Sequence, residues 1–159
     1  MKIHFDGVNF SSSSGPNTFG TRLAKELFNQ GHEVITSSGV DADISLVFIE
    51  RSHSRLAKKV VQRLDGIWFS QLEFRSKNVR IKELYNAADS VVWQSDFDRR
   101  VTTNLWHDRP GVVITNGIEL SPVKEITVPQ LARIRETYEH VFVCSANWHP
   151  QKRLKKNIE

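Results

Sequence analysis

The chain has 159 residues, of which 39% are hydrophobic and 25% are charged, enough for one domain with its own core and too few for two complete domains. This composition excludes a disordered chain, and a single cysteine, Cys144, excludes a disulfide framework. The formal net charge is +4, but basic and acidic residues are mixed along most of the chain, so no general affinity for nucleic acid is indicated.

The first residues, from Met1 to Asp6, have too short an apolar run for a signal peptide. No stretch of the sequence approaches the ~18 consecutive apolar residues of a membrane span. We therefore expect a soluble, cytoplasmic protein. Its mildly basic surface suits phosphate-bearing small molecules or peripheral contact with an anionic membrane.

Short β-type runs alternate with helical patterns along the chain, which is typical of an α/β fold with a parallel sheet. The first strand is predicted at residues 2–5, and a loop rich in serine and glycine follows it. Phe19, Leu23 and Leu27 then recur at the spacing of one helix face. Gly31 is predicted to end this helix, because glycine tolerates a positive φ.

The next strands are predicted at residues 32–36 and 44–49. The segment 52–69 is ambiguous, since its pattern suits a helix in one part and a strand in another. We predict a short helix at residues 56–61, followed by a strand at residues 60–64 that ends at an Asp-Gly pair.

A helix is predicted at residues 79–88 and a strand at residues 90–94. Ser95 and Asp98 then have the spacing of a capping box, in which each side chain satisfies a free backbone N–H at a helix start. The helix that begins there is predicted to run to about Trp106.

A further strand is predicted at residues 112–115, stopped by Asn116 and Gly117, which both tolerate a positive φ. The segment 119–128 has no periodicity and reads as a linker. A helix is predicted after it, at about residues 130–138.

A strand at residues 141–145 and a basic tail at 152–159 complete the pattern. We expect a first domain at residues 1–120, a linker and helix at 121–139, and the start of a truncated second domain at 140–159. A strand, a loop and one helical turn cannot bury their apolar faces alone. The chain is therefore expected to be a fragment, unless these elements pack back on the first domain.

Several stretches resemble one known family in their order and spacing. They are a first strand leading to a Gly-containing loop, Leu23-Ala-Lys-Glu-Leu-Phe-Asn-Gln-Gly-His-Glu-Val34, Val61-Gln-Arg-Leu-Asp-Gly66, Ala88-Asp-Ser-Val-Val-Trp-Gln-Ser95, Ile114-Thr-Asn-Gly-Ile-Glu119 and Ala146-Asn-Trp-His-Pro-Gln-Lys152. Together they resemble the N-terminal half of a GT-B glycosyltransferase of family 4. The resemblance implies a Rossmann-like, doubly wound parallel sheet, followed by the first elements of a second domain.

This resemblance also implies an activity, the transfer of a sugar with retention from a UDP- or GDP-linked donor to a hydroxyl. The acceptor would be a sugar, a lipid or a protein, bound mostly on the first domain, and the donor would bind mostly on the second. The nucleotide sugar is a co-substrate, so no cofactor is implied. The family needs no dedicated nucleophile, and no catalytic residue is assigned.

Ser14 and Gly15 are candidate diphosphate-binding residues, because they precede a helix start whose free N–H groups and dipole attract an anion. Gly15 would let the backbone approach the ligand closely. The family often has two adjacent glycines in this loop, whereas this chain has a serine and a glycine. The structural alternative is that Gly15, Pro16 and Asn17 form only a turn that leads into the helix.

In the second domain, the resemblance points to Asn147 and Lys152 as donor diphosphate-binding residues. Lys152 stands where the family has its lysine, and Asn147 stands where it has an arginine. Because asparagine cannot neutralise phosphate charge, the donor or its affinity is expected to differ. The alternative for Lys152 is a solvated basic tail. The family's later pair of glutamates has no counterpart here, so efficient turnover by this chain alone is not expected.

Arg63, Asp65, Asn116 and Gly117 are possible cleft or acceptor-side residues, because they fall at predicted strand ends. Arg63 is a cleft cation only if its strand points that way. A simple turn explains the Asp-Gly pair equally well, and it is the favoured interpretation of the Asn-Gly pair. The six histidines have no metal-ligand spacing, so we expect no metal site.

Two nucleotide-binding classes are disfavoured by incomplete motifs. Residues 15–22 have P-loop glycine spacing without the Lys-Ser/Thr pair, and no G-x-G-x-x-G follows the first strand. A different class stays open, a noncatalytic module that binds nucleic acid or an anionic surface through the basic tail. Loss of binding with salt and no nucleotide preference would favour that class.

Overall fold

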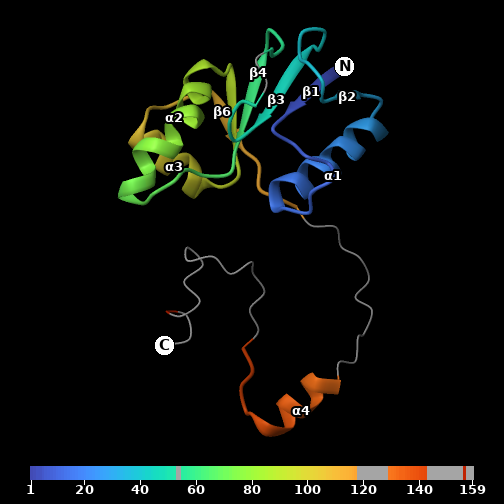
Figure 1. Cartoon of the computed structure of the whole chain (residues 1–159), viewed down its shortest axis with the longest axis vertical. Helices are drawn as coiled ribbons and strands as arrows, with labels where there is room; N and C mark the ends of the chain where they lie inside the picture. Colours follow the sequence, from blue (N-terminus) through green and yellow to red (C-terminus); the bar gives the residue numbers. More distant parts are fainter. Residues whose placement is uncertain (53–54, 118–128, 143–155, 157–159) are drawn as a thin grey trace. The chain divides into compact units, whose positions relative to one another are not determined.

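The structure of the protein is a computed structural model that describes residues 1–52, 55–117, 129–142 and 156 (Figure 1). Within these residues the strands are β1 Lys2–Asp6, β2 Glu33–Ile35, β3 Ile44–Phe48, β4 Val60–Leu64, β5 Ser90–Trp93 and β6 Gly111–Val113. The helices are α1 Gly15–Asn29, α2 Gln71–Ala87, α3 Asp96–Leu105 and α4 Pro129–Thr137.

The strands form one parallel sheet in the order β2-β1-β3-β4-β5-β6, which confirms the predicted α/β fold of the Rossmann-like, doubly wound type. From β1 the chain moves outward to β2 and then returns to β3 on the other side of β1. The order therefore reverses between β1 and β3. In open α/β sheets, ligands bind outside the carboxyl ends of the strands at such a switch point.

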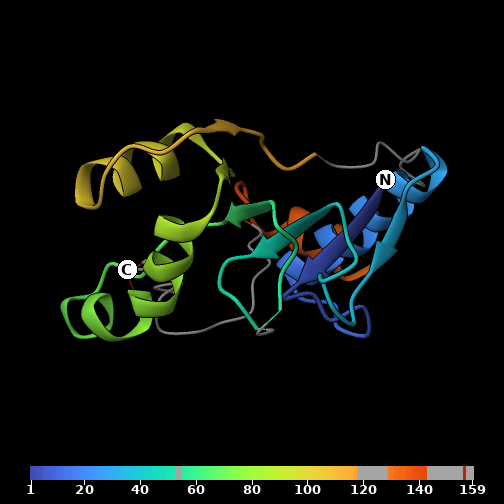
Figure 2. The same ribbon diagram turned by 90° about the horizontal axis from the view of Figure 1, so that it is seen from above.

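Helices lie on both faces of the sheet, α1 on one and α2 and α3 on the other (Figures 1 and 2). Successive residues of a strand point to opposite faces, so each strand serves both layers. The layer under α1 contains Phe5 and Phe48, packed with Phe19 of the helix. The opposite layer contains Leu64 and Trp93, packed with residues of α2.

Helix α1 ends as its sequence predicts. Gly31 has a φ of 81°, which confirms the expected positive φ. The N–H of Gly31 donates to the carbonyl of Phe28 at 3.0 Å, and the N–H of His32 donates to that of Leu27 at 2.9 Å. These paired bonds satisfy the last helical carbonyls and turn the chain into β2.

The predicted short helix at residues 56–61 is wrong, because the chain from residue 55 to β4 is extended or bent. Its backbone groups bond to neighbouring loops and side chains. The N–H of Ala57 donates to Ser45 Oγ at 2.8 Å, and the carbonyl of Arg55 accepts from Gly39 N at 3.2 Å. These bonds replace the helical ones and lead directly into β4.

Helix α2 begins eight residues before its predicted start at Val79, at Gln71. Ser70 caps it, since its Oγ accepts from Glu73 N at 3.2 Å and donates to Glu73 Oε2 at 2.8 Å. The apolar period is interrupted by Asn78, which is 3% exposed. Its amide bonds to the N–H and the carbonyl of Trp68, each at 2.9 Å, and so fixes the loop before the helix.

Strand β6 ends at Val113, two residues before its predicted end at Thr115. Asn116 and Gly117 were expected to turn the chain with positive φ, but neither has one. The side chain of Asn116 instead bonds to Arg63, which fixes this segment without a left-handed backbone.

The chain forms two units, Met1–Ile118 and Glu119–Glu159. The expected boundary after residue 120 and the linker up to residue 128 lie outside the described residues. Helix α4 in the second unit confirms the predicted helix. Val141 and Phe142 are not in a strand, and the rest of the strand predicted there lies outside the described residues. Across the described residues, the helices are too short or too polar to cross a membrane.

Candidate functional site

Three of the predicted polar residues meet at the carboxyl edge of the sheet. Arg63 lies in β4 and is only 4% exposed. Its Nη1 donates to Asp65 Oδ1, and its Nη2 donates to Asn116 Oδ1 at 2.9 Å. The strand order brings together residues that are 53 positions apart, because β4 and β6 flank β5 in one parallel sheet.

Aromatic rings complete the surroundings of the Arg63 guanidinium. Its Cζ lies 3.9 Å from the centroid of the Phe19 ring and 5.5 Å from that of Phe48. A cation over a ring face is attracted by the ring quadrupole, and more strongly where water is excluded. Phe19 belongs to the second turn of α1, so this contact connects the cluster to the start of that helix.

Burial is the main influence on the charges of this cluster. It lowers the pKa of Arg63 and raises the pKa of Asp65, while the attraction between the two groups opposes both shifts. Burial has the larger effect on each because it removes water from the charged form. The Asp65 side chain keeps 20% exposure, so a ligand hydroxyl can reach a carboxylate that is more basic than usual.

Ser14 and Gly15 lie at the exposed start of α1, with Ser14 in the N-cap position. The Ser14 hydroxyl accepts from Asn17 Nδ2 at 2.8 Å and makes no capping bond to a backbone N–H. The first turn also contains no acidic side chain. The helix start therefore retains the donors and the positive dipole end that favour an anion.

The loop before α1 is fixed by two contacts with the helix. Asn17 Oδ1 accepts from Asn9 N at 2.8 Å. A Cβ added to Gly20 would lie 2.8 Å from Val8 Cγ1, so the glycine allows the loop to approach the helix closely. Gly15 has no such role in the structure, since a Cβ there would meet nothing within 4 Å.

The switch point between β1 and β3 contains backbone conformations that the sequence did not predict. Gly7 has a φ of 84°, and a Cβ there would lie 2.8 Å from the Phe48 carbonyl oxygen. Ile49 has a φ of 66°, rare for a β-branched residue. Glu50 N donates to the carbonyl of Phe48 at 2.8 Å across it, which closes a three-residue turn of the less favourable kind.

A buried amide holds this turn in place. Gln62 Nε2 donates to the carbonyl of Ile49 at 2.7 Å and to that of Ile81 at 3.1 Å. The side chain is fully buried and ties β3 to α2. Strained backbone persists only where the surroundings determine it, and it is concentrated at functional sites.

A hollow of about 630 Å³ opens beside the switch point on the α2 side. Gly7, Ile49 and Trp68 are among its lining residues. Its two cations are already engaged, since Lys77 Nζ lies 2.7 Å from Glu73 Oε1 and Arg80 Nε lies 3.7 Å from Glu50 Oε2. This side of the switch point is therefore nearly balanced in charge.

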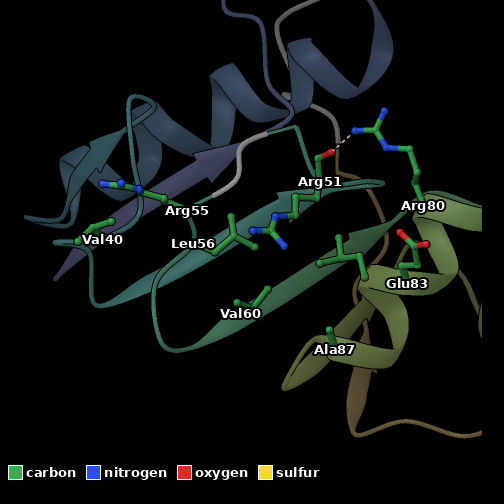
Figure 3. Close-up of a pocket in the computed structure, with 9 residues that line it drawn as sticks. Val40, Arg51, Arg55, Leu56, Val60, Arg80, Glu83 and Ala87 are labelled. Carbon is green, nitrogen blue, oxygen red and sulfur yellow. Dashed lines mark hydrogen bonds between the residues drawn. The ribbon is translucent and has the colours of Figure 1, made fainter.

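A second hollow, of about 540 Å³, lies between α2 and the segment that joins β3 to β4 (Figure 3). Arg51, Arg55 and Arg80 line it, but they do not converge on one point. Arg80 Nη2 donates to the Arg51 carbonyl at 2.6 Å, whereas the Arg55 side chain points toward Val40 in Figure 3. Its geometry does not define a single anion position.

Asp98 is a buried carboxyl that the sequence assigned only to helix capping. Ser95 Oγ accepts from Asp98 N at 3.1 Å, which confirms one half of the predicted capping box. Asp98 is 5% exposed, and its Oδ2 has no hydrogen-bond partner. Burial raises its pKa to about 6, with a smaller contribution from the charge of Asp65 and an opposing one from a backbone bond at Gln94.

The remaining predicted site residues are Gly117, Asn147 and Lys152, and the structure shows no contact that would assign a role to any of them. Gly117 is exposed, and a Cβ there would meet nothing within 4 Å. Asn147 and Lys152 lie outside the described residues. Among the residues that the structure describes, no three His, Cys, Asp or Glu side chains are grouped to hold a metal ion.

Comparisons with known proteins add no assignment to this geometry. No model of a protein family matches the sequence, and a comparison with curated proteins finds no match. The functional interpretation therefore rests on the carboxyl edge itself.

Proposed function

We propose that the chain is the acceptor-side part of a retaining glycosyltransferase resembling GT-B enzymes of family 4. The reaction would transfer a sugar from a UDP- or GDP-linked donor to a hydroxyl. The observation that carries this proposal is the cluster of Arg63, Asp65 and Asn116 at the carboxyl edge, connected through Phe19 to the start of α1.

The chemistry of the cluster suits the binding of an acceptor hydroxyl. Arg63 Nη1 donates a hydrogen bond to Asp65 Oδ1 and so orients the carboxylate. The exposed part of Asp65 can then accept a hydrogen bond from the hydroxyl, and Asn116 offers its amide beside it. A nucleophile held in one orientation reacts with much less loss of entropy than a free one.

The start of α1 suits the diphosphate leaving group of the donor. Negative charge grows on the diphosphate as the glycosidic bond breaks, and donors fixed in advance stabilise that charge. Gly15 offers its backbone N–H there without an acidic neighbour in the first turn, and Ser14, whose own N–H donates to Ser12 Oγ at 3.3 Å, offers its hydroxyl. Asn147 and Lys152 are proposed as further diphosphate-binding residues on the resemblance alone, and both lie outside the described residues.

The proposal is tested by titrating the 159-residue chain with UDP, GDP and inorganic pyrophosphate, followed by amide-resolved NMR. We expect saturable shifts at Gly15 and Asn17, with the nucleotides binding more tightly than pyrophosphate. Glycosides added next should shift Asp65 and Asn116. Asp65→Asn should weaken glycoside binding about tenfold, which corresponds to about 1.4 kcal/mol. Glu83→Gln, an exposed change on α2, serves as the matched control.

The outcomes separate the transferase from a noncatalytic anion-binding module. Absence of nucleotide and glycoside shifts at millimolar concentration would contradict the proposal. Binding of any polyanion with steep salt dependence and no preference for nucleotides would favour the noncatalytic module instead.

A further inference from the structure

The hollow of about 630 Å³ beside the switch point has a lining that buried polar side chains hold in place. Gln62 is fully buried and donates to the carbonyl of Ile49, one of the lining residues, at 2.7 Å. Asn78 is 3% exposed and bonds to both backbone groups of Trp68, a second lining residue, each at 2.9 Å. Two segments that are distant in sequence are thereby fixed around one hollow.

The same arrangement recurs at a third lining residue, Ser52. Its N–H donates to Asp6 Oδ2 at 3.0 Å, and Asp6 is fully buried at the end of β1. Burying an amide or a carboxylate costs desolvation free energy, which an apolar side chain of similar size avoids. Three such groups that hold the backbone of one hollow indicate a shape fixed in advance, as a binding site requires.

The lining of the hollow combines an aromatic ring with balanced charge. Trp68 is 37% exposed, and Lys77 Nζ lies 4.0 Å from the centroid of its ring. Lys77 pairs with Glu73, and Arg80 pairs with Glu50. The charges of the two pairs cancel, so the hollow has little attraction for an ionic ligand.

We propose that this hollow binds a neutral saccharide. A pyranose has an apolar face of C–H groups, which packs on the Trp68 ring, and hydroxyls at its rim, which bond to polar side chains. Glu50 accepts from these hydroxyls and Arg80 donates to them, since their side chains are 44% and 62% exposed. A phosphate would have to displace Glu50 or Glu73 from its cation. A purely apolar molecule would remove water from the ion pairs and replace none of its hydrogen bonds.

The position of the hollow identifies the saccharide as an acceptor, and this step rests on the proposed transferase function. Trp68 follows Asp65 by three residues in the loop after β4, and the N–H of Ile49 donates to the Arg63 carbonyl at 2.8 Å. The hollow and the polar cluster therefore share the carboxyl end of one strand. One hydroxyl of the saccharide is assigned to Asp65. Binding in the hollow itself does not require the transferase.

The test is NMR of the 159-residue chain during titration with methyl glucoside, methyl mannoside, methyl galactoside and maltose, without nucleotide. We expect saturable shifts at the Trp68 indole N–H and at the amides of Ile49 and Ser76 with at least one of them. Trp68→Ala should weaken binding about tenfold or more, and Trp68→Phe, which keeps an aromatic ring, about threefold. Glu50→Gln should weaken it about tenfold, because a charge-assisted hydrogen bond is lost.

Glu83→Gln is the matched control, because Glu83 is exposed on α2 and lines the neighbouring hollow instead (Figure 3). It should leave saccharide binding unchanged. The backbone bonds between Trp68 and Asn78 do not involve the indole, so circular dichroism and urea unfolding should show an intact fold in each variant.

Absence of shifts with all of these saccharides, or equal losses with Glu83→Gln, would overturn the proposal. An equal response of the same groups to inorganic phosphate or to hexanol would also overturn it, because the hollow would then select charge or apolar area. Binding of UDP and GDP without a response at Trp68 would reject this site and leave the transferase standing. A saccharide response at Trp68 without nucleotide binding would keep this site and reject the transferase.

Discussion

The two faces of the sheet differ most over β4, β5 and β6. On the α2–α3 side these strands are covered by helices, and the core includes Tyr85 and Trp93, both fully buried. Trp93 Nε1 donates to Thr102 Oγ1 at 2.9 Å, and the Tyr85 hydroxyl donates to the His107 carbonyl at 2.8 Å. Even the polar atoms of these aromatic side chains have partners in the protein.

On the α1 side, the described residues of the first unit cover the same strands only partly. A groove of about 300 Å³ runs beside α1, and its lining includes Val61, Val92 and Ile114. Ile114 remains 56% exposed. Arg63 is the polar side chain of this groove, held toward Asp65 and Asn116.

The difference indicates a division of roles. The α2–α3 side has the larger buried aromatic surface, and stability scales with apolar area removed from water. The α1 side contains the polar cluster and the helix start, where binding is proposed. Substitutions on the two sides should therefore separate stability from binding.

The largest effect is expected from Trp93→Ala. It removes a fully buried indole from the α2–α3 side and should lower the free energy of unfolding by about 3–5 kcal/mol. Val92→Ala, one residue earlier on the opposite face, should cost about 1 kcal/mol because that side chain is only half-buried. Urea unfolding measures both. Equal losses would contradict the division between the faces.

A smaller loss is expected from Arg63→Met. The change leaves Asp65 partly buried without its cation, and about 2 kcal/mol is expected, less than for a fully buried pair because the Asp65 side chain is 20% exposed. Loss of the cation should raise the pKa of Asp65 further. The destabilisation should therefore be present at neutral pH and shrink as the pH falls and Asp65 is protonated.

Arg63→Met with Asp65→Asn separates charge from packing in that experiment. If the unpaired carboxylate is the cause, the double variant should be more stable than Arg63→Met alone at neutral pH. Identical stabilities of the two variants would show that the loss comes from the missing contacts with Phe19 and Phe48 instead.

Much of this fold could be predicted from local sequence patterns. The β-branched runs located each strand of the sheet, and Gly31 located the end of α1. The start of α2 was missed because Asn78 stands where an apolar residue was expected, although Ser70 and Glu73 had the spacing of a capping box. The false helix at residues 56–61 arose because its backbone partners, such as Ser45, are distant in sequence.

The site could be predicted only in part, for a similar reason. Arg63, Asp65 and Asn116 were each named from strand ends, but their mutual bonds depend on the strand order. The positive φ of Ile49 has no sequence signal, because it is imposed by Gln62 and by the approach of neighbouring backbone. The exposure of Phe69 and Phe97 could not be predicted either, since phenylalanine side chains are more often buried in a core.

Asp98→Asn tests whether the buried Asp98 carboxylate on the α2–α3 side lowers the stability of the fold at neutral pH. Burial raises the pKa of Asp98 from 3.8 to about 6, because the folded protein favours the protonated carboxyl. Its contribution to the free energy of unfolding is therefore fully present below the unfolded pKa and is lost as the pH rises through about 6. At neutral pH the asparagine variant should be more stable by about 1–3 kcal/mol. Below about pH 4 the two proteins should be alike.

Urea unfolding of both proteins between acidic and neutral pH measures this difference. Asp96→Asn, an exposed change two residues earlier in the same helix turn, is the control and should show little pH-dependent gain. A constant difference between Asp98→Asn and the unaltered chain across that range would show that Asp98 is not the buried acid that the geometry indicates.

The smallest effect on stability is expected at Gly15, and it bears most directly on binding. Gly15 occupies the first turn of α1 with open space where a Cβ would lie, so Gly15→Ala should change the free energy of unfolding by no more than about 0.5 kcal/mol. Gly7→Ala is the contrast, since its positive φ and the nearby Phe48 carbonyl should make it cost about 1–3 kcal/mol.

If a diphosphate approaches the start of α1 closely, Gly15→Ala should weaken nucleotide binding while leaving urea unfolding unchanged, because the added methyl occupies space that only a ligand uses. Unchanged binding of UDP and GDP would show that the glycine has no part in recognition. The α1 side would then keep its acceptor cluster, but the anion-binding role of the helix start would have to be abandoned.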